Sequence, residues 1–280
     1  MITQGVITAV LIGIVITGLV PAIAGIALLA MHKIKASSFW AGVLAYIIAM
    51  IVITIITLIS AFAAADMAQS NPTLYGLILN VISAVCFGLS MSVCIIACMK
   101  KTRTFKGALS CGLGFGVGYL VNTAFSLITM YINFVNVNSG AFDQQMAQVV
   151  KMGMYTKEDV AMIKEQFTSI TATDMVSQIV STAAFAVILT AAAVFVMRGV
   201  CAKSSFIGMA ASVLVLAAGL ISSIIPNVVA ALVVMAAIGA AALIFAVRMR
   251  EQVTPPEKPA VQDDFLNSVA KAQSDTQGGE

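Results

Sequence analysis

Residues 107–134 read GALSCGLGFGVGYLVNTAFSLITMYINF, a stretch of apolar, small and uncharged polar residues. It contains no Asp, Glu, Lys, Arg or His. A helix needs about 20 mostly apolar residues to cross a hydrocarbon core that is roughly 30 Å thick. This stretch is long enough, and we predict that it is a membrane-spanning helix.

The rest of the chain has the same character. Of the 280 residues, 60% are hydrophobic and 10% are charged, and the mean hydropathy is +1.03. Soluble domains carry about 25% charged residues, so this composition excludes a water-soluble globular protein. A net charge of +3 offers no basic surface for nucleic acid. We therefore predict an all-α, polytopic membrane helix bundle with the lipid bilayer as its surroundings.

Seven segments of this kind divide the chain, and none of them contains a charged residue or a histidine. One continuous helix through the last two would be about 66 Å long at 1.5 Å per residue, twice the thickness of the core. The chain must therefore turn back, and Pro226 within 222–227 provides the break. The predicted spans are 5–31, 38–64, 74–99, 107–134, 175–197, 204–225 and 227–247.

The basic residues predict the orientation of these spans. They follow the first, third, fifth and seventh span, and all except Lys151, Lys157 and Lys164 fall on one side. Loops rich in Lys and Arg face the cytoplasm. We expect the N-terminus outside and the C-terminus in the cytoplasm.

The chain divides into a transmembrane domain, 1–250, and a tail, 251–280. Within the domain, the outer loop 135–174 carries apolar residues at helical spacing, which predicts two short amphipathic helices. Thr156 and Asp159 have the spacing of a capping box at the start of the second one. The tail is rich in proline and acidic residues, and we expect it to be disordered.

Three of the inner hairpins share a sequence pattern at the start of the returning helix. A basic residue, a hydroxyl residue and a phenylalanine are followed by Gly42, Gly107 or Gly208. Two interpretations are open. Inward hairpins can converge on this pattern, because each needs an anchor, a cap and a site of close packing. A triplicated hairpin with one span appended would produce it as well.

Two predicted spans, 74–99 and 107–134, carry uncharged polar residues on one helical face, at intervals of three and four. They can form a polar cleft that is open to a ligand from outside, or they can hydrogen-bond across a buried helix interface. The candidate ligand-binding residues are Asn80, Ser83, Ser90, Tyr119, Asn122, Ser126, Thr129 and Asn133.

Four glycines open the span 107–134 and predict close helix packing. They form two small-xxx-small pairs, Gly112 with Gly116 and Gly114 with Gly118. Such pairs let the backbones of two membrane helices approach each other.

No residue of the chain is a candidate for catalysis. Chemistry inside a membrane nearly always requires an ionisable residue within a span, and there is none here. Cys94, Cys98 and Cys111 lie near one depth, but zinc needs about four ligands. Buried free cysteines commonly act as small hydrophobic residues. We predict no metal site, no cofactor and no catalytic residue.

The third and fourth spans nevertheless resemble a known family. Residues 99–108 (MKKTRTFKGA) leading into 112–116 (GLGFG) are similar to the YhfC-like family, a bacterial family assigned as intramembrane metalloproteases. The stretches 158–167 (EDVAMIKEQF) and 38–42 (SFWAG) fit that family too, and the resemblance covers roughly residues 34–225. It implies a zinc-protease scaffold in the cytoplasmic membrane of a bacterium.

The catalytic groups that the resemblance implies are absent. Where that family has a Glu-Glu pair followed by Arg, this chain has 87–92, FGLSMS. Phe115 and Tyr119 fall near the family's His and Glu, and the later positions are apolar or small. A zinc hydrolase needs ligands and a base beside activated water. The resemblance therefore implies a scaffold that has lost its chemistry.

Three functions follow from these observations. The first is a non-catalytic binding or regulatory membrane protein, which holds a small amphipathic ligand or a membrane-protein partner, or forms a homo-oligomer. The second is a permease or transporter subunit for a small uncharged or amphipathic solute, since transporters often contain internal repeats. The third, an active intramembrane metalloprotease, would require unconventional ligands such as the three thiols.

Overall fold

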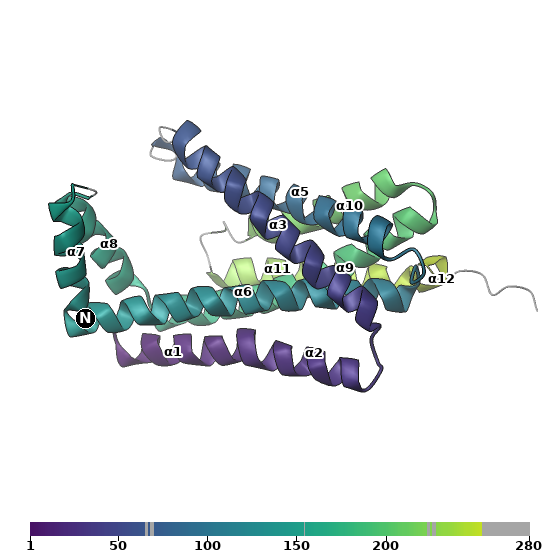
Figure 1. The fold of residues 1–280 in the computed structure, drawn as a ribbon, viewed down its shortest axis with the longest axis horizontal. Coiled ribbons are helices and arrows are strands. Elements are labelled where there is room, and N and C mark those ends of the chain that lie inside the picture. Colours follow the sequence, from purple (N-terminus) through teal and green to yellow (C-terminus); the bar gives the residue numbers. More distant parts are fainter. Residues whose placement is uncertain (65–66, 68–69, 154, 223–224, 226–227, 254–280) are drawn as a thin grey trace, which may run out of the picture.

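The computed structural model describes residues 1–64, 67, 70–153, 155–222, 225 and 228–253, and these residues form an all-helical bundle without strands (Figure 1). In this part of the chain, six helices are long and apolar enough to cross a membrane. The first, Gln4–Ala30, consists of α1 (Gln4–Ile14), the π-helical turn η1 (Val15–Leu19) and α2 (Val20–Ala30). The others are α3 (Ala36–Ala63), α5 (Pro72–Cys98), α6 (Phe105–Ser139), α9 (Ala172–Cys201) and Val229–Arg248 of α11 (Val228–Arg248).

The seventh predicted span corresponds to α10 (Ser205–Ser222), which packs against α5, α9 and α11. It has 18 residues. At 1.5 Å per residue it is about 27 Å long, slightly shorter than a hydrocarbon core. The structure thus has six candidate spans and one shorter apolar helix where the sequence predicts seven spans. Most of the predicted break at 222–227 lies outside the described residues.

Two short helices follow α6 at one end of the bundle (Figure 1): α7 (Ala141–Lys151) and α8 (Lys157–Ser169). The capping box at Thr156 and Asp159 is formed. The hydrogen bonds from Thr156 lower the pKa of Asp159, so the cap is retained above the ordinary pKa of a carboxyl and lost as the pH falls through the lowered value. Lys164 Nζ binds Asp143 Oδ2 at 2.7 Å and links α8 to α7.

The N-terminal helix is anchored to α6 at its start. The side chain of Asn138 at the end of α6 accepts from Ile2 N at 2.7 Å and donates to Ile2 O at 3.0 Å. At η1, the buried Thr17 donates its Oγ1 proton to Gly13 O at 2.8 Å. A π-helical turn holds more residues than an α-helical turn and often marks a functional segment.

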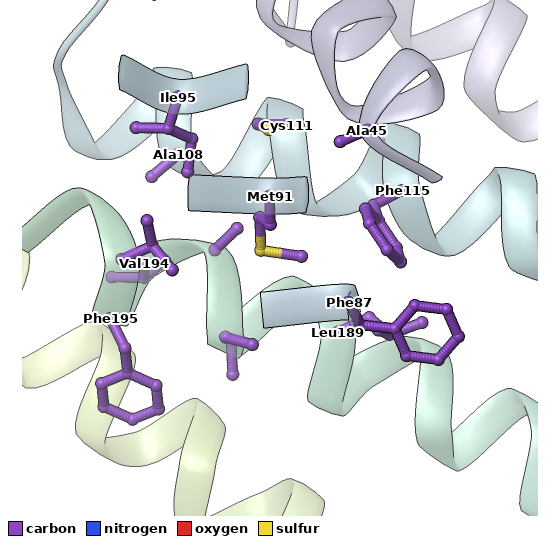
Figure 2. Packing of buried hydrophobic residues seen from close by; sticks show 14 of the residues in the cluster. Ala45, Phe87, Met91, Ile95, Ala108, Cys111, Phe115, Leu189, Val194 and Phe195 are labelled. Carbon is purple, nitrogen blue, oxygen red and sulfur yellow. The ribbon is translucent and has the colours of Figure 1, made fainter. Parts of the chain in front are cut away.

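The core is built around α9. Fifteen of its 30 residues are buried, and it packs against α6, α10, α11 and α1. Figure 2 shows residues of α5, α6 and α9 in one apolar cluster, with Met91, Cys111 and Leu189 among them. The last described helix, α12 (Arg250–Val253), joins this cluster through Val253, which is buried. The rest of the predicted tail, 254–280, lies outside the described residues.

The four paired glycines of α6 lie at two different helix contacts. A Cβ on Gly114 would clash with Phe39 O, and one on Gly118 would lie 2.8 Å from the Tyr46 ring, both on α3. A Cβ on Gly112 would lie 2.6 Å from Thr190 Cα, and Gly116 approaches Ala186, both on α9. The two interleaved pairs therefore bring two helices onto two faces of α6.

The glycines of the three hairpins differ in what they contact. A Cβ on Gly42 would clash with Cys111 O of α6, and one on Gly107 would clash with Thr102 O of its own turn. Gly208 approaches Gly199 of the preceding helix, since a Cβ there would lie 2.7 Å from Gly199 Cα. The shared pattern thus serves three different contacts, which favours convergence over triplication.

We predict opposite effects of two glycine-to-alanine substitutions. Gly114→Ala places a methyl group against a backbone oxygen that cannot move alone, and overpacking of this kind costs about 1–3 kcal/mol. Gly76→Ala in α5 meets no atom within 4 Å and should stabilise the helix by up to about 1 kcal/mol. Thermal unfolding in detergent measures both. A Gly114→Ala protein as stable as the Gly76→Ala protein would contradict this account of the α3–α6 contact.

Candidate functional site

Polar residues follow one face of the N-terminal half of α9. The helix begins at a second capping box, in which Thr171 and Asp174 bond to each other's backbone N–H groups. Ser177, Gln178, Ser181 and Thr182 then recur at spacings of three and four. Residues at this spacing share one helical face.

This face borders a cavity of about 420 Å³, which we name the α9 cavity. Six of its eleven lining residues carry polar side chains. The remainder of the wall comes from α6, α10, α11 and residue 225. The lining residues are Tyr119, Asp174, Ser177, Gln178, Ser181, Thr182, Phe185, Leu220, Ile225, Ala231 and Met235.

The polar groups of the α9 cavity are suited to hydrogen bonding. Thr182 is buried and donates its hydroxyl proton to Gln178 O at 2.7 Å, which leaves its oxygen able to accept. Asp174 is exposed, and its Oδ2 accepts from Thr171 N at 2.9 Å and from Thr171 Oγ1 at 2.7 Å. The lining residues include no His, Cys, Lys or Arg. The cavity therefore offers hydroxyl and amide groups for binding, together with the exposed carboxylate of Asp174.

An aromatic cluster from four helices forms the inner wall of the α9 cavity. Tyr119 and Phe185, which both line the cavity, lie with ring centroids 5.2 Å apart. Phe115 and Phe87 follow deeper in the bundle at 5.5 Å from each other, and Tyr46 of α3 lies 5.4 Å from Phe115. Edge-to-face pairs of this kind contribute about 0.5–1.5 kcal/mol beyond their burial. The cluster gives the cavity a rigid floor.

Two of the eight predicted ligand-binding residues contribute to this site. Tyr119 lines the cavity. Asn80 of α5 lies behind the wall, where its Nδ2 donates to Leu220 O of α10 at 3.3 Å. Asn80 thus supports the wall rather than facing a ligand.

The other six predicted residues do not line the α9 cavity. The hydroxyl groups of Ser83 and Ser90 donate to carbonyls of their own helix, Leu79 O and Phe87 O. On α6, Asn122, Ser126 and Thr129 are exposed and Asn133 is half-buried. The two predicted faces meet at Phe87 of α5 and Tyr119 of α6, whose ring centroids lie 6.5 Å apart.

The three thiols lie together without forming a metal site. Cys94 and Cys111 are buried, and the exposed Cys98 lies within hydrogen-bonding reach of Cys94. Among the described residues, no group of three or more His, Cys, Asp and Glu side chains could hold a metal ion.

Sequence reasoning missed Ser177, Gln178, Ser181 and Thr182. Their signal was present, because they continue the same spacing that identified the polar face of α6. They directly follow the outer loop, and polar residues near the end of a membrane span are common, so they did not mark a site. Only the packing of α10 and α11 against α9 shows that they enclose a cavity.

Tyr46 provides a test of the aromatic floor. Its Oη is buried and has no hydrogen-bond partner among the described residues. An unpartnered buried polar group costs about 1–3 kcal/mol, so Tyr46→Phe should leave stability unchanged or raise it. Phe115→Leu in the same cluster should lower it by about 1–2 kcal/mol. Thermal unfolding in detergent measures both, and a marked loss with Tyr46→Phe would show that this hydroxyl has a partner.

The comparisons with known proteins add no relative. No protein-family model, no curated protein and no solved structure matches this chain.

Proposed function

We propose that this chain is a non-catalytic integral membrane protein that binds a small uncharged polar or amphipathic ligand in the α9 cavity. The observation that carries the proposal is the polar row from Asp174 to Thr182, which lines a cavity of about 420 Å³ within an otherwise apolar bundle. Ligand pockets are typically of about 300–1,000 Å³, with a few placed polar groups in an apolar wall. The aromatic floor and Met235 supply that wall.

The α9 cavity has one charged lining residue, at an exposed position, and this supports an uncharged ligand. Its single ionised lining residue, Asp174, is exposed and already accepts two hydrogen bonds from Thr171. Deeper in, only hydroxyl groups, the Gln178 amide and aromatic rings are available. A buried ionised ligand group without a partner of opposite charge would be strongly disfavoured.

The proposal includes an orientation. We take α10 as the seventh span and place the N-terminus outside and the C-terminus in the cytoplasm of a bacterial cell. The basic residues support this, because all except Lys151, Lys157 and Lys164 belong to the other side of the bundle. The α9 cavity then opens outward, at the end of α9 that follows α8.

We also retain the YhfC-like scaffold as a proposal, with its chemistry lost. Phe87, Phe115 and Tyr119 stand where the resemblance places catalytic groups. Their rings are in mutual contact, with Phe87 5.5 Å from Phe115 and 6.5 Å from Tyr119. A scaffold that has lost its catalytic groups would still bring these three positions together. In this chain, aromatic rings occupy them.

A permease subunit is the second candidate, and one observation favours it. A hollow of about 210 Å³ lies at the opposite end of α9, beside the contact between Gly199 of α9 and Gly208 of α10, and is lined by residues of both helices. The same helix pair therefore borders a cavity at each end. Buried residues such as Leu189 and Val194 close the space between them. Transporters alternate access to a central site between two such openings.

Cysteine labelling tests whether the α9 cavity holds water. In a protein with its five native cysteines replaced by alanine, Ser181→Cys should react with a membrane-impermeant maleimide, because the side chain faces the cavity. Val187→Cys on the same helix is exposed outside the cavity and should not react. Equal labelling of the two positions would contradict the proposed site.

A second measurement tests binding itself. Small molecules retained by the purified protein are identified by mass spectrometry, and Ser181→Leu should lose a molecule that Val180→Leu, at an exposed position of α9 outside the cavity, keeps. Uptake of that molecule into proteoliposomes then separates the two functions. Retention without uptake supports a binding protein, whereas uptake that Ser181→Leu abolishes would overturn it in favour of the permease. If neither variant differs from the native protein, the cavity binds nothing.

A further inference from the structure

A second hollow lies where α2 separates from the bundle. It has a volume of about 270 Å³ and is bordered by α2, α6, α9 and the start of α3. Of its fourteen lining residues, Thr190 alone has a polar side chain, and its Oγ1 donates to Ala186 O at 2.9 Å. We name this hollow the α2 groove, and its lining includes Pro21, Gly25, Leu28, Phe39, Val117 and Ala183.

Small residues keep the α2 groove open. Its wall includes Ala24 and Gly25 of α2, Gly116 of α6, and Ala183 and Ala186 of α9. A Cβ on Gly25 would lie 3.3 Å from the Phe39 ring. α1 packs against both α6 and α9, whereas the main contact of α2 is with α6. The groove therefore opens toward lipid between α2 and α9.

Lysines gather at one end of the α2 groove. Leu28 and Ile34 line it, and the turn between them carries His32 in the left-handed conformation, with φ of 53°, followed by Lys33. Lys106 Nζ donates to His32 O at 3.1 Å, which holds a second ammonium group at this turn.

Lys35 adds a third ammonium group, whose Nζ donates to Thr104 Oγ1 at 3.3 Å. No acidic residue offsets this charge nearby in the sequence. Within 1–64 and 70–142, the stretches that the structure describes here, there is no Asp or Glu.

We propose that the α2 groove and Lys33, Lys35 and Lys106 together form a binding site for an anionic phospholipid. One acyl chain lies in the groove, because hydrocarbon is the only abundant partner for an apolar hollow that opens into a bilayer. The phosphate lies against the lysines, since basic pockets at the ends of membrane helices bind anionic head groups. The site is separate from the α9 cavity and does not depend on its function.

The single tryptophan, Trp40, gives a direct readout. It is 61% exposed and contacts Phe39 of the groove, with ring centroids 5.6 Å apart. In vesicles, brominated phosphatidylglycerol should quench Trp40 fluorescence at a lower mole fraction than brominated phosphatidylcholine. Lys33→Gln should reduce this preference about fivefold, following the usual contribution of one lysine near a lipid surface. Lys151→Gln, on α7, is the matched control and should leave it unchanged.

The groove itself is tested by filling it. Ala183→Phe should weaken quenching by both lipids, whereas Ala27→Phe, at an exposed position of α2 outside the groove, should not. Thermal unfolding checks that both variants are folded. Equal quenching by the two lipids, or an Ala183→Phe protein that responds like the Ala27→Phe protein, would overturn the proposal.

Discussion

The close approach of α3 and α9 to the backbone of α6 is the contact on which the rest of the bundle depends. Lipid tails are as apolar as leucine, so no hydrophobic force drives helices together inside a membrane. Packing and interhelical hydrogen bonds must do so. Gly114 and Gly118 admit α3, and Gly112 and Gly116 admit α9. Once α9 is in place, α10 and α11 pack on its remaining surface.

Hydropathy predicted the class of the fold because crossing a bilayer requires little more than length and the absence of charge. It did not predict partners. The intervals that mark a polar face on α6 hold in the structure, yet Asn122 and Ser126 are exposed, and Tyr119 of that face contacts Phe87 of α5 rather than a polar side chain. Periodicity identifies a face of a helix, but only the tertiary packing determines what that face meets.

The α9 cavity also shows that helical spacing alone does not reveal what a polar face contacts. Tyr119 was predicted as a site residue because it belongs to the polar row on α6. Gln178 and Thr182 have the same helical spacing on α9, but the sequence alone did not identify them as site residues. Their surroundings come from Leu220 and Met235, which are far along the chain. The apolar residues of the cavity wall resemble the other apolar residues of the spans, so composition does not distinguish them.

The π-helical turn at Val15–Leu19 has a consequence for the evolution of the N-terminal helix. The inward residues Val10, Gly13, Thr17, Pro21 and Gly25 follow one another at steps of three and then repeatedly of four. Each step of four residues in an α-helix turns about 40° beyond a full turn, and the wider π-helical turn compensates for this excess rotation. Removing one residue there would restore a regular helix, and the rotation of about 100° lost with that residue would match the rotation that the wide turn already takes up, so the helix after it keeps nearly the same orientation. Gly25 would still face Phe39, so this short segment is a place where the N-terminal helix can gain or lose one residue without turning α2 against α1.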